Sequence, residues 1–222
     1  MKKNNCQDEN IIIKRVVGSH HLRLSVNKQG QVVLRMPFFC PKGVALRFLD
    51  SHQDWIEEQK EKRAKQLTFR DGMSLTVLGE SVVIRHCEEE RRGTCIEGGE
   101  LLVSGDMAFL DRRVCDFIKK QTAVYIDRKA RELAAQIGQK INHISLKDTT
   151  SRWGSCSGKK NLNFCWRLGL APLFVLDYII AHEVAHLQEM NHSLKFWRVV
   201  SQLCDRRSDA EIWLRRHGNS LR

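Results

Sequence analysis

The alternation of apolar and polar residues near the start of the chain predicts β structure. Apolar residues occupy every second position over 22–26 and again over 32–36, with a glycine-containing turn at 27–30 between them. This pattern is typical of a β-hairpin with one buried face. Apolar residues at helical spacing then predict a helix over 44–66. Further strands are expected at 74–78, 82–86 and 100–103.

The second half of the chain is mainly helical in pattern. Apolar residues at helical spacing run over 107–137, and Gly138 then stands where a helix commonly ends. Pro172 suits the first turn of another helix, and Ser193 can cap a third. The remaining expected elements are a short strand at 144–146, a turn at 151–158, an alternating strand at 161–170 and a final amphipathic segment around 212–214. The sequence therefore predicts an α+β fold.

His182, Glu183 and His186 form the pattern HExxH within the helix expected after Pro172. Two histidines four residues apart on a helix lie about 40° apart around its axis and roughly 6 Å apart along it. Both imidazoles then lie on one face and can share one zinc ion. Glu183 is placed to take a proton from a water that the metal activates. The motif predicts a zinc-dependent hydrolase.

The third metal ligand has several candidates. His192 comes six residues after His186, and on a continued helix it would lie on the wrong face. We therefore expect the helix to end at Asn191, because Asn adopts the left-handed conformation readily. Glu189 shares a helix face with His182 and is an alternative ligand, or an acceptor for an imidazole N–H. Carboxylates from a later helix also remain open as ligands: Asp205, Asp209 and Glu211.

The expected chemistry is hydrolysis of a carbonyl compound. A catalytic zinc with three protein ligands keeps one position for water, lowers the pKa of that water and polarises a carbonyl group. Glu183 would accept the proton and pass it to the leaving amine. The only tyrosines are Tyr125 and Tyr178, and nothing in the sequence places either in a cleft as a second donor to the oxyanion.

The formal net charge of +11 favours association with nucleic acid or another anionic surface. The basic residues are spread along the chain, however, so a generally basic solvated surface is the alternative interpretation. The longest apolar stretch, 168–181, is short and contains Asp177, and no membrane association is expected. The first ten residues lack the apolar core of a signal peptide, which favours a cytoplasmic location.

Several segments, in a fixed order, carry a resemblance to a known family. They are Arg-Trp-Gly-Ser-Cys-Ser at 152–157, a strand ending in Trp-Arg-Leu at 166–168, and the histidine motif at 182–193. This order resembles the YgjP-like family of bacterial metal-dependent hydrolases over most of 141–205. The resemblance implies a zincin-like fold related to SprT and WLM-domain proteases. By analogy with those proteins, His182, His186 and His192 would hold the metal and Glu183 would be the base.

The expected domain organisation is a β-rich region with one helix at 1–105, followed by a zincin-like metallopeptidase domain at 106–222. The polar face of the strand at 161–170 suits the wall of a cleft. Candidate substrate-binding residues are therefore Asn163 and Arg167, together with Arg152. For Arg152 the alternative is an ion pair with a carboxylate such as Glu189.

Four functions are consistent with the sequence. The first is a zinc peptidase acting on a peptide or protein substrate. The second is a nucleoside triphosphate pyrophosphohydrolase, for which Lys159, Lys160 and Arg167 would supply cations. The third is a DNA-associated protease similar to SprT. The fourth is a non-catalytic zinc-binding module, against which Glu183 argues because a structural site needs no base.

Overall fold

The chain folds into two compact units, 1–66 and 67–222. One hydrophobic core lies in the first unit and two lie in the second. The sequence led us to expect a domain boundary between 105 and 106, whereas these two compact units divide between 66 and 67. The reason is that the strands between 74 and 104 pack on the long helix that follows them and belong with it. The computed structural model describes residues 11–26, 31–64, 68–88, 93–149 and 151–221.

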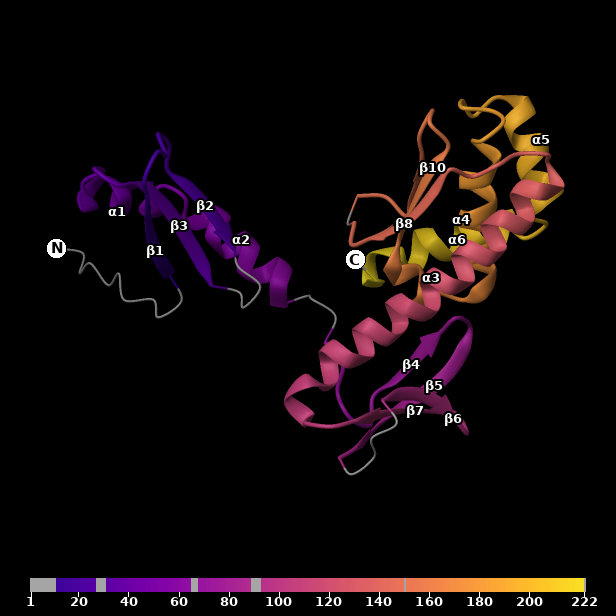
Figure 1. The fold of residues 1–222 in the computed structure, drawn as a ribbon, viewed down its shortest axis with the longest axis horizontal. Helices are drawn as coiled ribbons and strands as arrows, with labels where there is room; N and C mark the ends of the chain where they lie inside the picture. Colours follow the sequence, from indigo (N-terminus) through magenta and orange to yellow (C-terminus); the bar gives the residue numbers. More distant parts are fainter. Residues whose placement is uncertain (1–10, 27–30, 65–67, 89–92, 150, 222) are drawn as a thin grey trace. The chain divides into compact units, whose positions relative to one another are not determined.

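The first unit is a three-stranded sheet with two helices (Figure 1). Its strand order is β1-β3-β2, in which β2 is antiparallel and β1 parallel to the central strand β3. The elements are β1 (Ile11–Val16), β2 (Arg23–Val26), β3 (Val32–Pro37), α1 (Lys42–Asp50) and α2 (Gln53–Ala64). Leu34 and Met36 of β3 pack with Leu49 of α1 and Ile56 of α2 in the core.

The pairing of β2 with β3 confirms the predicted hairpin, while its turn at 27–30 lies outside the described residues. The predicted helix over 44–66 is instead two helices, because the chain turns at Ser51 and His52. Strand β1 was not predicted. Its parallel partner β3 lies some twenty residues away along the chain, so no local pattern marks the pairing.

The second unit begins with a four-stranded sheet in the order β4-β5-β7-β6. Its strands are β4 (Ser74–Val77), β5 (Glu80–Cys87), β6 (Thr94–Glu97) and β7 (Glu100–Ser104). The short strand β6 was not predicted, whereas the other three were. A short 3-10 helix (Met107–Phe109) then leads into α3 (Leu110–Gln136), and Gly138 beyond it has φ 66°, as expected after a helix.

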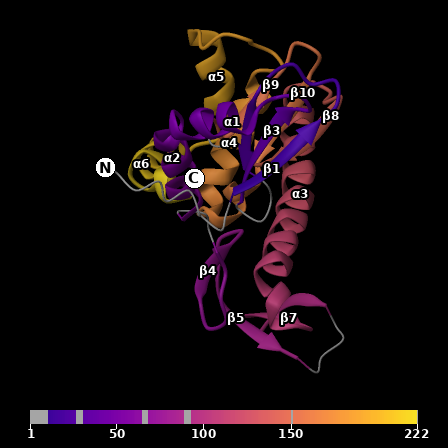
Figure 2. The ribbon, with the colours of Figure 1, turned by 90° about the vertical axis from the view of Figure 1, so that its left-hand side faces the viewer.

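Helix α3 contributes side chains to both cores of the second unit. Val114 and Ile118 in its first half pack against the four-stranded sheet. Ile126 and Leu133 in its second half pack in the cluster that includes helix α4 (Leu173–Ala185). Figure 1 and Figure 2 show α3 running from the sheet of β4–β7 into the half of the unit that contains α4. The helix therefore connects the two halves of this unit.

A second sheet of the unit has the order β8-β10-β9. Its strands are β8 (His143–Lys147), β9 (Gly154–Cys156) and β10 (Asn161–Cys165). Strand β10 pairs in parallel with β8 and antiparallel with β9, which leaves β9 as an edge strand. The segment predicted as a turn at 151–158 thus contains a strand. The strand predicted over 161–170 ends at Cys165, and 166–170 forms a 3-10 helix.

Three helices complete the second unit: α4, α5 (Leu194–Leu203) and α6 (Arg207–His217). Helix α4 starts directly after Pro172 and buries most of its residues, so it is the central helix of its core. Within the described part of the chain, no helix combines the length and apolar character that a membrane span requires.

Candidate metal centre

Helix α4 ends earlier than the sequence predicted. Its last residue is Ala185, and His186 follows with φ −65° and ψ −16°. Backbone hydrogen bonds from Leu187, Gln188 and Glu189 to Val184 and Ala185 close the last turn. Asn191 does not end the helix in a left-handed conformation as predicted, since non-glycine residues with positive φ in the described ranges occur only at Leu78 and Lys160.

His192 lies on the short connection between α4 and α5. Ser193 follows it and caps α5, because its Oγ accepts a hydrogen bond from the backbone N–H of Phe196 at 3.4 Å. The chain therefore reverses between His186 and His192 in a few residues. This reversal brings the third histidine back over the end of α4.

The three histidines converge. One ring nitrogen from each of His182, His186 and His192 lies within 4.8 Å of the other two. The closest pair is His182 Nε2 and His192 Nε2, which are 3.1 Å apart. Across the described residues, this is the one group of histidine, cysteine and carboxylate side chains with such a spacing. A set of three histidines with this geometry could hold a metal ion.

Neighbouring groups orient two of the three rings, those of His186 and His192. His186 Nδ1 lies 3.0 Å from the backbone carbonyl oxygen of Glu189, so its Nδ1 proton is donated there and Nε2 keeps its lone pair. Phe196 stacks on His186 with ring centroids 4.5 Å apart, and Trp197 stacks on His192 at 5.7 Å. Glu189 thus contributes through its backbone, and its carboxylate is not part of the cluster.

Burial favours the neutral imidazoles of His182 and His186. It lowers the pKa of His182 to about 4, and the nearby His186 and His192 lower it further because two positive charges repel. Burial also lowers the pKa of His186. A metal ion binds the neutral form of imidazole, so protons would compete only weakly with a metal ion for these two rings.

Glu183 is almost completely buried, with 6% of its surface exposed, on the face of α4 that meets strand β9. Burial raises the pKa of its carboxyl group to about 7, and the positive charge of Arg152 opposes this rise. A methyl group on Gly154 would lie 2.6 Å from Cγ and Oε1 of Glu183. Gly154 therefore provides the space that the carboxylate occupies.

Glu183 and His182 line a cavity of about 290 Å³, and its lining also includes Tyr178 and Glu211. The hydroxyl group of Tyr178 donates to Glu211 Oε1 at 2.9 Å, and Arg207 Nε donates to the same oxygen at 2.8 Å. The sequence analysis found no place for Tyr178. Its position four residues before His182 was the available signal, since that spacing puts both on one helix face.

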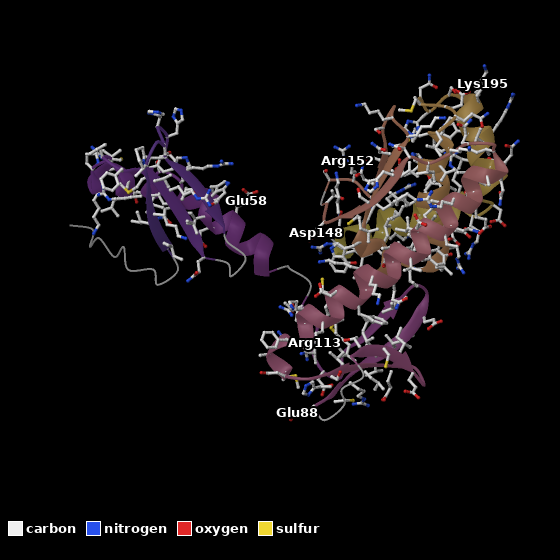
Figure 3. All side chains as sticks on the ribbon, viewed as in Figure 1. Glu58, Glu88, Arg113, Asp148, Arg152 and Lys195 are labelled. Atoms are coloured by element: carbon white, nitrogen blue, oxygen red, sulfur yellow. The ribbon has the colours of Figure 1, made fainter. Side chains whose placement is uncertain are left out.

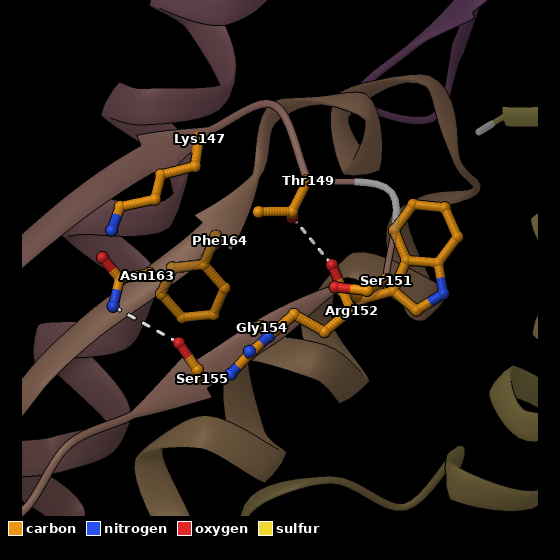
Figure 4. Close-up of a pocket in the computed structure, with 9 residues that line it drawn as sticks. Lys147, Thr149, Ser151, Arg152, Gly154, Ser155, Asn163 and Phe164 are labelled. Atoms are coloured by element: carbon orange, nitrogen blue, oxygen red, sulfur yellow. Dashed lines mark hydrogen bonds between the residues drawn. The ribbon is translucent and has the colours of Figure 1, made fainter. Parts of the chain in front are cut away.

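The predicted substrate-binding residues separate into two groups. Asn163 and Arg152 line a second cavity of about 360 Å³ (Figure 4). Arg167 is buried elsewhere: its Nε donates to Asp148 at 2.9 Å and its Nη1 to the backbone carbonyl of Leu221 at 3.2 Å. Figure 3 shows Asp148 and Arg152 on the segment that follows β8. The structure thus places Arg167 in a structural ion pair.

The mixed α+β fold places a histidine cluster that could hold a metal ion at the end of the helix with the HExxH motif, an arrangement typical of metal-dependent hydrolases. The family described as YgjP-like, metallopeptidase domain, matches residues 20–217. The chain belongs to this family, and the resemblance seen over 141–205 extends across most of its length. No curated protein and no solved structure matches the chain significantly.

Proposed function

We propose that the chain is a zinc-dependent peptidase in which His182, His186 and His192 hold one zinc ion and Glu183 is the general base. The observation that carries this proposal is the convergence of three imidazole nitrogens within 4.8 Å, next to a buried carboxyl group. Three imidazoles form a donor set that zinc favours, and they leave a coordination position for a ligand from solution.

Zinc bound at these histidines would supply a Lewis acid that polarises the substrate carbonyl and makes water more acidic. The residues of the chain handle the proton. The pKa of Glu183, raised to about 7 by burial, suits a group that takes up and releases a proton near neutral pH. Its carboxyl group would receive the proton from the attacking water and return it to the amine of the leaving peptide.

Strand β9 offers a means of holding a peptide backbone. Among the described strands it pairs only with β10, so its other edge is open to a backbone partner. Glu183 lies close to Gly154 of this strand, in space that any larger residue at position 154 would fill with its side chain. An extended peptide paired with β9 would therefore run past the base and the three histidines.

A nucleoside triphosphate pyrophosphohydrolase is the second candidate. Lys147 and Arg152 lie in the cavity next to Glu183 and could bind phosphate groups. A single metal site of three histidines favours acyl chemistry, because phosphoryl transfer usually uses two metals or one metal with several cations. A DNA-associated role has the net charge of +11 in its favour and stays a prediction.

The test compares the zinc-loaded wild type with Glu183→Gln in casein cleavage and in bound zinc. We expect cleavage to fall by at least about 100-fold, the usual contribution of a general base, while one zinc per chain remains. Glu189→Gln is the matched control and should keep full activity, since only the backbone of Glu189 contacts the site. Unchanged cleavage in Glu183→Gln would contradict the proposal. Pyrophosphate release from nucleoside triphosphates, without any peptide cleavage, would replace it.

A further inference from the structure

The cavity of about 360 Å³ beside the metal centre has a distinct chemical character. Its size is at the lower end of the range for small-ligand pockets, about 300–1,000 Å³. Lys147 at the end of β8 and Arg152 before β9 contribute positive charges to its lining, and none of the described lining residues is acidic. The cavity therefore favours a negatively charged ligand.

The cavity adjoins the catalytic groups. Trp153 and Gly154 line both this cavity and the one that contains His182 and Glu183. Gly154 lies directly against the Glu183 carboxyl group. The two cavities are therefore separated by about one residue of strand β9. A ligand group in the larger cavity would thus lie one or two residues along a peptide from the bond being cleaved.

Hydrogen bonds arrange neutral donors around the same space (Figure 4). Ser145 Oγ donates to Asn163 Oδ1 at 2.7 Å, which fixes the amide so that Nδ2 donates to Ser155 Oγ at 3.3 Å. Since Ser155 accepts this bond, its own hydroxyl proton can be donated to a ligand. Thr149 Oγ1 donates to the backbone carbonyl of Arg152 at 2.8 Å and holds the segment that carries the guanidinium group.

Nearby acidic groups do not neutralise the two cations. Asp148 lies between Lys147 and Arg152 in sequence, yet its carboxylate is held by Arg167 at 2.9 Å. In the described ranges, no carboxylate hydrogen-bonds to Lys147 or Arg152, although the charge of Arg152 does influence Glu183. Two cations that lack an ion-pair partner beside a catalytic site are suited to bind an anionic group of the substrate.

We propose that this cavity is a subsite for a carboxylate of the peptide substrate, bound by Lys147 and Arg152 beside the cleaved bond. The proposal rests on the peptidase function above. The carboxylate could belong to an acidic side chain or to the C-terminus of the peptide. The chemistry of recognition is the same for both, and the experiment separates them.

The experiment measures kcat/KM of the zinc-loaded full chain on quenched peptides that differ only by Glu or Gln at each position around the cleaved bond. We expect Glu to be preferred by about tenfold at one position, since each of two exposed charge pairs contributes up to about fivefold. In the double variant Lys147→Gln/Arg152→Gln, this ratio should fall to about one. A second pair of peptides, with a free or an amidated C-terminus, tests the terminal carboxylate in the same way.

Two features make the readout specific. The Glu-to-Gln ratio is insensitive to a general loss of activity, which Arg152→Gln is expected to cause through its effect on Glu183. Lys140→Gln is the control, because Lys140 is exposed and precedes β8 at the end opposite Lys147, and it should leave the ratio unchanged.

The outcomes distinguish this proposal from the proposed function. Efficient peptide cleavage with a ratio of one in the wild type, for both side-chain and terminal carboxylates, would overturn the subsite and leave the peptidase intact. If no peptide is cleaved and nucleoside triphosphates are hydrolysed in a manner that depends on Lys147 and Arg152, both proposals are wrong and the cavity binds phosphate. A tenfold preference that survives in the double variant would assign the carboxylate to another site.

Discussion

Gly154 and Glu183 fit together so closely that a single methyl group added to Gly154 would overlap the carboxyl group of Glu183. The distance from an ideal Cβ on Gly154 to Oε1 of Glu183 is 2.6 Å, well inside van der Waals contact. Only 6% of the surface of Glu183 is exposed, and a methyl group on Gly154 would have to displace its carboxyl group. Gly154 therefore determines where the carboxyl group of Glu183, the proposed base, lies.

We therefore expect Gly154→Ala to lower kcat/KM by about 100-fold, the effect of misplacing a catalytic group by about 1 Å. The control is Gly158→Ala in the turn after β9, where an added Cβ meets no atom within 4 Å. Peptide cleavage and bound zinc should be measured for both variants. Wild-type activity in Gly154→Ala would show that the carboxyl group does not act from its buried position.

Zinc affinity should depend on His192 and not on the Glu189 side chain. His192→Ala removes one of three converging nitrogens, and we expect the affinity to fall by at least about 100-fold. Glu189→Ala keeps the backbone carbonyl that accepts from His186 Nδ1, and its affinity should stay within a few-fold of wild type. Competition titration with a chelator measures both. The reverse order of the two affinities would make Glu189 the third ligand.

The metal-free protein should show a stability that depends on pH through Glu183. Its carboxyl pKa is about 7 when folded and near 4.5 in an unfolded chain, so the folded form binds the proton more tightly. Its contribution to the free energy of unfolding therefore falls as pH rises from about 4.5 through 7, by up to about 3 kcal/mol. In Glu183→Gln this decrease in the free energy of unfolding should be absent, because glutamine does not titrate.

Urea unfolding in the presence of a chelator at pH 5 and at pH 8 tests this expectation. The stability advantage of Glu183→Gln over wild type should be larger at pH 8. The buried histidines titrate in both proteins, so their effect largely cancels in the difference. Glu97→Gln, at an exposed position, should show the same difference from wild type at both pH values. A difference for Glu183→Gln that does not change with pH would refute the expectation.

Arg167 and Arg152 should respond differently to the same substitution. Arg167→Met removes a buried guanidinium that binds Asp148 and the carbonyl of Leu221, and should lower the free energy of unfolding by about 1–3 kcal/mol. Its KM should not change. Arg152→Met at an exposed position should leave stability nearly unchanged and raise KM for acidic peptides. Thermal unfolding and steady-state kinetics separate the two, and a raised KM in Arg167→Met would return that residue to the substrate site.

Local signals in the sequence predicted the parts of the site that depend on local geometry. The spacing of His182 and His186 and the capping role of Ser193 follow from helix geometry and side-chain type. The end of α4 at Ala185 was not predictable, because the apolar residues Leu187 and Met190 continue the helical pattern beyond it. The early end depends on how the connection packs against α5, which a sequence window does not contain.

The misplaced parts depend on contacts between distant residues. Gly154–Cys156 has the composition of a turn, and it becomes strand β9 because it pairs with β10 and packs on α4. Arg167 follows the alternation of the preceding strand in sequence. The backbone turns into a 3-10 helix at Trp166, however, and this directs Arg167 toward Asp148 and away from the site.

Helix α3 has a consequence for how the protein loses its structure. Its first half packs against the sheet of β4–β7, and its second half packs in the core that also contains α4. Unfolding of either core would therefore disrupt the helix on which the other core depends. Residues 67–222 should therefore denature as one cooperative block. Damage to the remote sheet, such as truncation of the fully buried Ile84, would then lower the temperature at which the protein releases its metal.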